Sequence, residues 1–337
     1  MHYGFSLRAL SFTLQEGLMD KKLGPATRDA YGEALIELGK VNPDVVVLDA
    51  DLSKSTKTAG FGEKFPNRFF NLGIQEADMV GIAAGLALSG KIPFVSSFAC
   101  FLTCKGYDQL RMSVAFPEAN VKVVASHGGI SVGEDGASQQ SIEDIALMTS
   151  LPNFVVINPS DAVQTKALVL EAARHKGPVY IRTGRPKTPV LYAINTSFEV
   201  GKGTRLKEGK DITLIANGLL VFECLLAEEK LRAEGIEASV IDIHTVKPID
   251  KDLLLEEAKK THAFVVAEEH QIWGGLGSAV ARVTAQDCPV PIEFVAIQDT
   301  YSESGKPEEL FQKYGLTASH IIHRAKRVLS RKGRVTV

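Results

Sequence analysis

Short runs of aliphatic and β-branched residues alternate with helix-length segments along almost the whole chain. This alternation predicts buried parallel strands that are joined by helices. In the first half of the chain we expect strands at 44–49, 92–97, 121–126, 154–158 and 179–182, and helices at 28–41, 76–89, 142–149 and 161–173. In the second half we expect strands at 212–216, 238–243, 263–268 and 290–295, and helices at 221–234, 250–261, 276–287 and 318–329.

The chain has 337 residues, which is long enough for two domains of ordinary size. Between 186 and 210 the pattern breaks into Pro, Gly, Thr and Lys, a composition typical of linkers. We therefore predict a two-domain α/β protein, in which a parallel-sheet domain precedes a smaller α/β domain. The predicted parts are an N-terminal arm at 1–21, the first domain at 22–188, a linker at 189–209 and the second domain at 210–332.

The composition argues against several classes of function. A formal net charge of -2 offers no basic surface for nucleic acid. No apolar run approaches the length of a membrane span, and the first residues lack the apolar core of a signal peptide. We therefore expect a cytoplasmic protein. We also expect no metal site in this chain, because its four cysteines lack metal-finger spacing: Cys100, Cys104, Cys224 and Cys288.

The stretch from Phe70 to Leu88 places one carboxylate, Glu76, at the entrance of a helix rich in glycine and alanine. Small residues let a second backbone or a flat ligand approach closely, and a buried carboxylate is costly unless a partner binds it. A structural interpretation is equally open, because the helix dipole stabilises a carboxylate in the first turn. Glu76 alone therefore does not decide between a site and a stable helix start.

An aromatic pair and a glycine-rich segment follow two of the expected strands. Phe98 and Phe101 come after the strand at 92–97, at the end where α/β sheets place their ligands, although both rings could also belong to the core. The segment 127–140 follows the strand at 121–126 and suits a loop that crosses a strand end. Its histidine and aspartate could bind hydroxyl groups or phosphate, or could form turns.

Two arginines, Arg182 and Arg185, lie at and just after the last strand of the first domain. Arginine is well suited to bidentate contacts with phosphate. Together with Arg28 and Ser55 these residues would form a pocket for an anionic substrate if the fold brings them together.

With these residues in view, the chain from about 26 to 329 resembles the C-terminal half of transketolase, a thiamine-diphosphate enzyme. The resemblance implies that the first domain binds the aminopyrimidine end of the cofactor and that the last domain is mainly structural. Glu76, in Ile-Gln-Glu-Ala-Asp-Met, matches the family's essential glutamate, whose hydrogen bond to a pyrimidine nitrogen favours the imino tautomer. The exocyclic nitrogen of that tautomer removes the thiazolium proton. The implied cofactor-binding residues are Glu76, Phe98, Phe101, Asp51 and Leu52.

The resemblance also implies a binding site for a sugar phosphate. Asp135 falls where transketolases bind a substrate hydroxyl, and Gln139 stands where the family usually has histidine. Glutamine cannot become a cation near neutral pH, so we expect the donor substrate or its orientation to differ. The residues at the phosphate-binding positions are Arg28, Ser55, His127 and Arg185.

The family's diphosphate motif, which begins Gly-Asp-Gly and ends with a spaced Asn, does not occur in this chain. The chain therefore resembles the C-terminal subunit of a split transketolase, which moves a two-carbon ketol unit between sugar phosphates. The resemblance implies an N-terminal partner subunit that holds the diphosphate and Mg²⁺ or Ca²⁺. We expect a heterotetramer of two chains of each kind.

Other interpretations stay open. The beta subunit of a 2-oxoacid dehydrogenase decarboxylase and a deoxyxylulose-phosphate-synthase-like enzyme would share Glu76. A non-catalytic scaffold subunit is favoured only by Gln139, and the retained Glu76, Phe98 and Phe101 argue against it.

Overall fold

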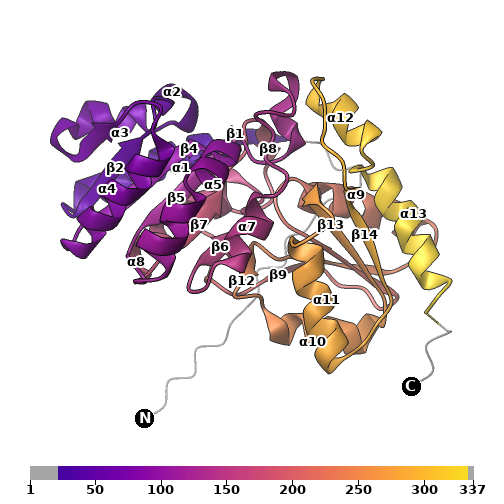
Figure 1. Cartoon of the computed structure of the whole chain (residues 1–337). Helices are drawn as coiled ribbons and strands as arrows, with labels where there is room; N and C mark the ends of the chain where they lie inside the picture. Colours follow the sequence, from indigo (N-terminus) through magenta and orange to yellow (C-terminus); the bar gives the residue numbers. More distant parts are fainter. Residues whose placement is uncertain (1–21, 333–337) are drawn as a thin grey trace, which may run out of the picture.

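The computed structural model describes residues 22–332, so the predicted N-terminal arm at 1–21 lies outside the described residues. The described chain forms two open sheets with helices on their faces, and the two units lie side by side (Figure 1). A sheet of seven strands is built mainly from the first half of the chain, and a sheet of five strands from the second half. This architecture is the two-domain α/β fold that the sequence predicts.

The larger sheet has the strand order β12-β6-β7-β5-β4-β2-β3. Its strands pair in parallel, except that β12 runs antiparallel to β6. Because β12 comes from the second half of the chain, both halves contribute to this sheet. The strands are β2 (Val45–Asp49), β3 (Phe69–Asn71), β4 (Ile92–Phe98), β5 (Lys122–Ser126), β6 (Val155–Ile157), β7 (Val179–Arg182) and β12 (Thr245–Lys247).

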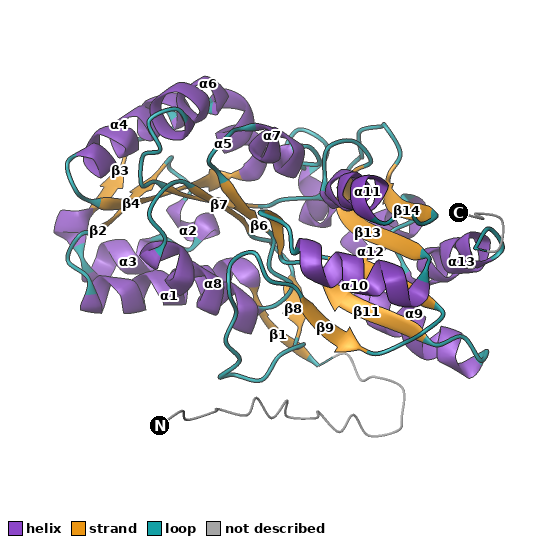
Figure 2. Cartoon of the chain, turned by 90° about the horizontal axis from the view of Figure 1, so that it is seen from below, coloured by secondary structure: helices purple, strands orange, loops and turns teal. Residues whose placement is uncertain are grey.

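Helices cover both faces of the larger sheet (Figure 2). One face packs against α1 (Thr27–Val41), α3 (Ala59–Lys64) and α8 (Ala162–Arg174). The opposite face packs against α4 (Glu76–Leu88), α5 (Ala99–Lys105), α6 (Tyr107–Gln109) and α7 (Asp144–Ser150). Shorter helical turns are α2 (Ser53–Thr56), η1 (Pro66–Arg68), η2 (Leu110–Ala115) and η3 (Ile130–Asp135).

The apolar pattern of the sequence explains these layers. Helix α1 buries Tyr31, Ala34, Leu35 and Leu38, which share one stripe of a helix with 3.6 residues per turn. Strands β2 and β5 are buried along their whole length, as expected for parallel strands with helices on both faces.

The smaller sheet has the order β14-β13-β10-β11-β9, in which only β9 runs antiparallel to its neighbour. Its strands are β9 (Thr204–Lys207), β10 (Ile212–Ala216), β11 (Ala238–Asp242), β13 (Phe264–Gln271) and β14 (Ile292–Ile297). One face packs against α9 (Leu220–Ala233) and α13 (Ala318–Leu329), and the other against α10 (Lys251–Thr261) and α11 (Leu276–Asp287). The remaining helix is α12 (Pro307–Lys313).

The expected strands and helices agree with the structure to within a few residues. The elements that were not expected are short, and they include the helices α3, α5 and α12 as well as strands at sheet edges. Strand β9 lies inside the predicted linker at 189–209 and pairs with β11, so that part of the segment belongs to the second sheet. Strand β1 (Leu23–Ala26) pairs with β8 (Lys187–Pro189) in a separate two-stranded sheet. Such short, partly exposed strands have too few apolar residues to give a periodic signal.

Candidate active site

Six strands of the larger sheet run parallel and end at one edge, and a predicted site residue follows or ends five of them. Strands β2, β3, β4, β5 and β7 run parallel, so their carboxyl ends meet at this edge. Asp51 follows β2, Glu76 begins the helix after β3, and Phe98 ends β4. His127 follows β5, and Arg185 lies beyond β7. The topology therefore gathers these residues along one edge.

Glu76 is a buried carboxylate with few partners. It begins α4, where the helix dipole favours a negative charge, and its side chain is only 2% exposed. Its Oε1 accepts a hydrogen bond from the Ser97 hydroxyl at 3.1 Å, and its Oε2 lies 3.9 Å from the Nζ atom of Lys105. Since a carboxylate offers about four acceptor positions, the described residues leave Glu76 with capacity to bind a ligand.

Aromatic rings are stacked beside Glu76. The rings of Phe98 and His127 lie 3.8 Å apart, and those of Phe98 and Phe101 lie 5.6 Å apart and nearly parallel. The ammonium group of Lys105 lies over the Phe101 ring, 4.7 Å from its centroid. The flat aromatic surface and the carboxylate are thus next to each other, as a flat heteroaromatic ligand with a ring nitrogen would require.

The structure brings the predicted anion-binding residues together. Arg28 donates a hydrogen bond to the Ser55 carbonyl oxygen at 3.1 Å, and its NH1 lies 3.3 Å from the Nε2 atom of His127. Burial, with the charges of Arg28 and Arg185, lowers the pKa of His127 to about 3, so this ring is neutral near pH 7. Burial lowers the pKa of Arg28 as well, and Arg185 adds to the effect while Asp29 opposes it. A bound anion would relieve the repulsion between the two guanidinium groups.

Asp135 lies at the same place but is paired with Arg185. The NH1 atom of Arg185 is 3.5 Å from Asp135 and 3.4 Å from Glu134, and it donates to the Val132 carbonyl oxygen at 2.5 Å. Both acidic side chains are exposed. Since exposed ion pairs are weak, an anionic substrate can compete with them for Arg185.

Gln139 attaches the glycine-rich loop to the helix that carries Phe101. Its backbone carbonyl oxygen accepts a hydrogen bond from the Cys100 thiol at 3.4 Å, and its side-chain Oε1 accepts one from the Ser138 hydroxyl at 2.5 Å. Burial raises the pKa of Cys100 to about 12, so the thiol keeps the proton that it donates. The Gln139 side chain is half-buried.

The turn after β2 holds Asp51 in the left-handed region, with a φ of 64°. Its backbone N–H and its carboxylate each bond to the Asn71 side chain at 3.1 Å. The N–H of Leu52 donates to Asp49 at 2.6 Å. Backbone strain that is fixed in this way is frequent at functional sites.

Arg182, which the sequence places beside Arg185, does not join the anion-binding residues. It is buried, lies 3.4 Å from the carboxylate of Asp144, and donates to the carbonyl oxygens of Ser141 and Glu269. Because Glu269 belongs to β13, Arg182 joins the two sheets.

Sequence reasoning did not assign Ser97, Lys105 or Asn71 to the site. Ser97 is a polar residue in an otherwise apolar buried strand, and Lys105 follows Phe101 by one helical turn. Both patterns were visible but are too common to single out a residue. The contact of Asn71 with Asp51 depends on the pairing of β2 with β3.

Within residues 22–332 no group of three or more His, Cys, Asp or Glu side chains is placed to hold a metal ion. None of the helices in this part of the chain is both long enough and apolar enough to cross a membrane.

Two family models match the chain. The transketolase pyrimidine-binding domain matches residues 24–190, and the transketolase C-terminal domain matches residues 201–321.

Among known proteins, a putative transketolase C-terminal section of Methanocaldococcus jannaschii is 48% identical over 306 residues, which cover 90% of this chain and 95% of that protein. The 6-deoxy-6-sulfo-D-fructose transketolase subunit of a Clostridium species is 41% identical, with the same coverage of 90% and 95%. Human transketolase is 39% identical over 86% of this chain and 47% of its own length.

Among solved structures, one described as a split gene transketolase, an inactive beta4 tetramer, is 50% identical to this chain. It superimposes with a TM-score of 0.87 and covers 92% of this chain and 100% of its own. A transketolase from Campylobacter jejuni is 26% identical, with a TM-score of 0.75 over 91% of this chain and 47% of that one.

Proposed function

The chain belongs to the transketolase family, and from this premise we propose that it is the C-terminal subunit of a split transketolase. Its activity would be the transfer of a two-carbon ketol unit between sugar phosphates. The relatives that it covers for 95% of their length are a transketolase C-terminal section and a transketolase subunit. They support this reading over a 2-oxoacid dehydrogenase subunit or a deoxyxylulose-phosphate-synthase-like enzyme.

One observation carries the proposal for the site. Glu76 is a buried carboxylate with one hydrogen bond and one distant cation among the described residues, and that cation also lies over the ring of Phe101. The aminopyrimidine ring of thiamine diphosphate fits both features, because its flat face can stack on Phe98 or Phe101 and its ring nitrogen can share a proton with Glu76. Bound thiamine diphosphate supplies the carbanion chemistry of ketol transfer. In this proposal Glu76 holds the shared proton at the pyrimidine nitrogen.

We assign the anionic end of the substrate to Arg28 and Arg185. The neutral ring of His127 stacks on Phe98, accepts a hydrogen bond from Arg28 at Nε2 and pairs with the Ser126 hydroxyl at Nδ1, so it can orient the Arg28 guanidinium without repelling it. A phosphate fits this charge. A sulfonate is a second candidate, because the Clostridium relative is named for a 6-deoxy-6-sulfo sugar. Fructose 6-phosphate and 6-deoxy-6-sulfofructose, compared as donors, distinguish the two.

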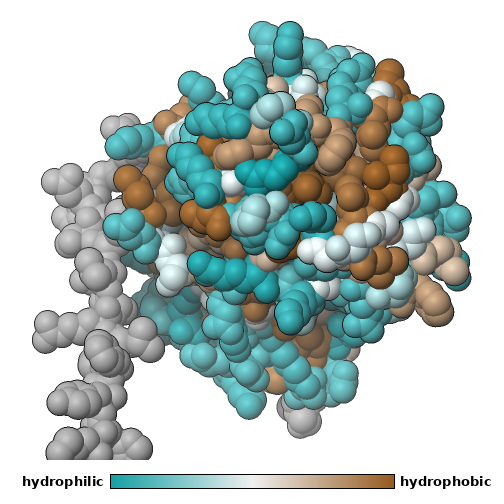
Figure 3. All heavy atoms as spheres, turned by 90° about the vertical axis from the view of Figure 1, so that its left-hand side faces the viewer, coloured by the Kyte–Doolittle hydropathy of each residue, from teal (hydrophilic) through white to brown (hydrophobic). Residues whose placement is uncertain are grey.

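The partner in this proposal is an N-terminal subunit that carries the diphosphate motif and holds Mg²⁺ or Ca²⁺. Two copies of the present chain would pair through α4, and each would bind one partner, giving a heterotetramer. Gly81 and Gly85 on α4 face open space, so a second backbone can approach. Figure 3 shows hydrophobic side chains gathered on this side of the molecule, and those exposed on β3, α4, η2 and the adjoining turns are Phe70, Ile74, Ile82, Leu88, Met112 and Phe116.

The four cysteines are free in the structure, which supports the proposal of a reducing, cytoplasmic location.

Reconstitution tests the proposed function. The chain is mixed with the N-terminal subunit that carries the diphosphate motif, and thiamine diphosphate and Mg²⁺ are added. Ketol transfer is then measured for the pair and for each chain alone. We expect transfer only by the pair. Full activity of the present chain alone, or no activity of a pair that demonstrably forms, would contradict the proposal. Light scattering on the same pair tests the heterotetramer, since a single heterodimer would exclude it.

Substitution of the anion-binding residues separates the proposed reaction from the 2-oxoacid alternative. Arg28→Ala and Arg185→Ala should raise KM for phosphorylated donors much more than for hydroxypyruvate, which has no phosphate. An equal effect on both donors would contradict the assignment of these arginines. Turnover of pyruvate in preference to ketose phosphates would favour the alternative.

A further inference from the structure

Lys105 makes two contacts in the candidate active site. Its Nζ atom lies 3.9 Å from Oε2 of Glu76, and the same atom lies over the ring of Phe101 at 4.7 Å from the centroid. Lys105 is the last residue of α5, so its side chain turns back along the helix toward residues one turn earlier. One ammonium group thus lies at both the buried carboxylate and the aromatic surface.

These are the two contacts that the proposed function gives to the pyrimidine ring of the cofactor. A ring that stacks on Phe101 takes the space above its face, and a ring nitrogen bonded to Glu76 takes the free position at its carboxylate. We propose that Lys105 is a placeholder: its ammonium group occupies the pyrimidine position while the site is empty and leaves when the cofactor binds. This inference rests on the proposed function.

The energetics of the two contacts agree with this role. The Lys105 side chain is 55% exposed, so its ammonium group remains accessible to water and can move out without being desolvated. The distance to Glu76 exceeds that of a hydrogen bond, and a cation over an aromatic ring at an exposed site contributes only modestly. Both contacts are therefore weak enough for a bound ring to displace the ammonium group.

A purely structural role makes a different prediction. A lysine in the last turn of a helix is stabilised by the helix dipole wherever its ammonium group points. In that case the removal of the lysine would change the stability of the chain slightly and would leave cofactor affinity unchanged. The measurement that separates the two roles is therefore the affinity for the cofactor.

The experiment is calorimetric titration of the reconstituted pair, with Mg²⁺, using thiamine diphosphate and thiamine as separate probes. Lys105→Met keeps the length of the side chain and removes its charge, and Lys105→Ala removes most of the side chain. We expect both variants to bind both probes about three- to ten-fold more tightly than wild type, because the pyrimidine no longer displaces a cation. Lys105→Arg keeps the charge and should bind like wild type.

Lys91→Met is the matched control, because Lys91 forms an ion pair of 2.9 Å with Asp44 at a site away from the proposed pocket. It should leave both affinities unchanged. Unchanged or weaker binding by Lys105→Met and Lys105→Ala would overturn the placeholder. Weaker binding of thiamine diphosphate with unchanged binding of thiamine would also overturn the placeholder, because Lys105 would then bind the diphosphate group. Failure of the wild-type pair to bind either probe would instead contradict the proposed function.

Discussion

Glu76 and Glu257 are both buried carboxylates on helices, and their surroundings differ. In Glu257, on α10, Oε1 accepts a hydrogen bond from Arg205 at 2.7 Å and Oε2 accepts one from the Thr213 hydroxyl at 2.8 Å. In addition, the Nζ atom of Lys260 lies 3.7 Å from Oε1 of Glu257. Glu76 has one hydrogen bond, at 3.1 Å, and one cation at 3.9 Å. Burial is similar in the two residues, but only Glu257 has a strong partner on each oxygen.

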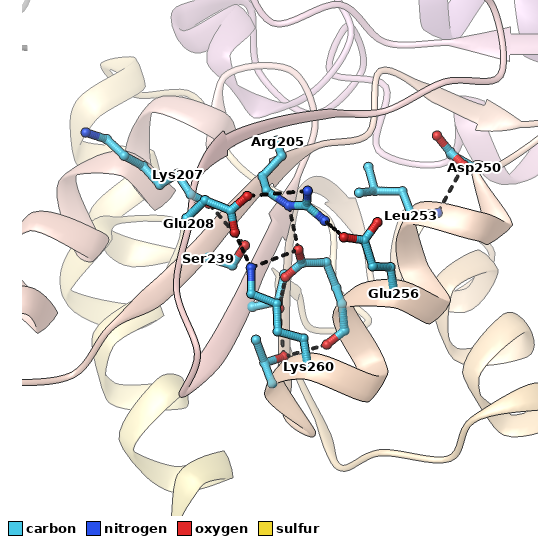
Figure 4. Close-up of polar contacts among 11 residues, drawn as sticks. Arg205, Lys207, Glu208, Ser239, Asp250, Leu253, Glu256 and Lys260 are labelled. Carbon is cyan, nitrogen blue, oxygen red and sulfur yellow. Dashed lines mark hydrogen bonds and ion pairs between the residues drawn. The ribbon is translucent and has the colours of Figure 1, made fainter. Parts of the chain in front are cut away.

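The surroundings of Glu257 form a network within the second unit (Figure 4). Arg205, on the edge strand β9, also binds Glu256 at 2.8 Å and lies 3.4 Å from Glu208. Glu208 is in turn paired with Lys260 of α10. These contacts hold the antiparallel edge strand against the helix, so the network has a structural role.

Burial of a charged residue does not by itself indicate function. Breaking a buried ion pair is costly because a charge is left without compensation, which explains why Glu257 has partners on both oxygens. A buried carboxylate whose partners are few and long has binding capacity left for a ligand. The difference between the two glutamates predicts that their substitutions will affect different properties of the protein.

The largest expected effect is that of Glu76→Gln on catalysis. Glutamine keeps the volume of the side chain but cannot hold a proton at the pyrimidine nitrogen, so we expect kcat/KM of the reconstituted pair to fall about 100- to 10,000-fold. The free energy of unfolding should stay the same or rise, because a poorly compensated buried charge is removed. Ketol-transfer kinetics and urea unfolding measure the two quantities.

Asp78→Asn is the control, because Asp78 lies in the same first turn of α4 but is exposed. It should change neither quantity. A Glu76→Gln pair as active as wild type, or a variant that unfolds far more easily, would place Glu76 in the same class as Glu257.

For Glu257→Ala we expect the opposite pattern. The substitution leaves Arg205, which is 22% exposed, without its main partner, so the free energy of unfolding should fall by about 3 kcal/mol. Cofactor affinity of the folded pair should not change, because Glu257 lies in the other unit. Glu256→Ala removes an exposed partner of the same arginine and should cost less than about 1 kcal/mol. An equal loss from both variants would show that burial of Glu257 does not matter.

Lys122 is a buried cation to which no carboxylate within residues 22–332 is paired. Its ammonium group donates to Asn120 and to the carbonyl oxygens of His175 and Gly177 at 2.7–2.8 Å. Burial lowers its pKa to about 7. The unfolded chain keeps this proton up to about pH 10, so above pH 7 the unfolded state binds more protons than the folded state. The free energy of unfolding should therefore rise, by about 2 kcal/mol between pH 7 and pH 9.

Urea unfolding over this pH range, with Lys122→Met as the reference, isolates the contribution of Lys122 from that of other groups. The difference between the two proteins should follow the predicted rise. If wild type and Lys122→Met have parallel profiles, the ammonium group keeps its proton in the folded state.

The fold was largely predictable from the sequence, because the long elements have strong apolar periods. The pattern of α1 and the continuous apolar run of β2 indicate their type and their burial without further information. Strand β12 was not predictable, because three residues from the second half of the chain add to the sheet of the first half. Such a pairing depends on how the two units dock, which no local pattern encodes.

The site was predictable where residues follow strand ends. The positions of Asp51, Phe98 and His127 follow from the topology of parallel strands, and the structure places Arg28 within 3.3 Å of His127. The roles of these residues remain proposals. The different roles of Arg182 and Arg185 were not predictable. Arg182 pairs with the buried Asp144 and Arg185 with the exposed Glu134, and the sequence does not show which carboxylate each side chain reaches.

The smallest expected effects come from single hydroxyl groups, and these give the most closely matched test of the two glutamates. Ser97→Ala removes the only hydrogen bond that the described residues donate to the Glu76 side chain, and Thr213→Val removes one of those to Glu257. Each bond is worth about 1 kcal/mol. In the pyrimidine site the loss also leaves the carboxylate less fixed, so Ser97→Ala should lower kcat about five-fold in addition to lowering the free energy of unfolding by about 1 kcal/mol. In the network the remaining partners still compensate the charge, so Thr213→Val should lower the free energy of unfolding by about 1 kcal/mol and leave kcat unchanged. If both variants lost stability alone, the hydroxyl of Ser97 would be structural, and the contrast between the two carboxylates would rest on Glu76 itself.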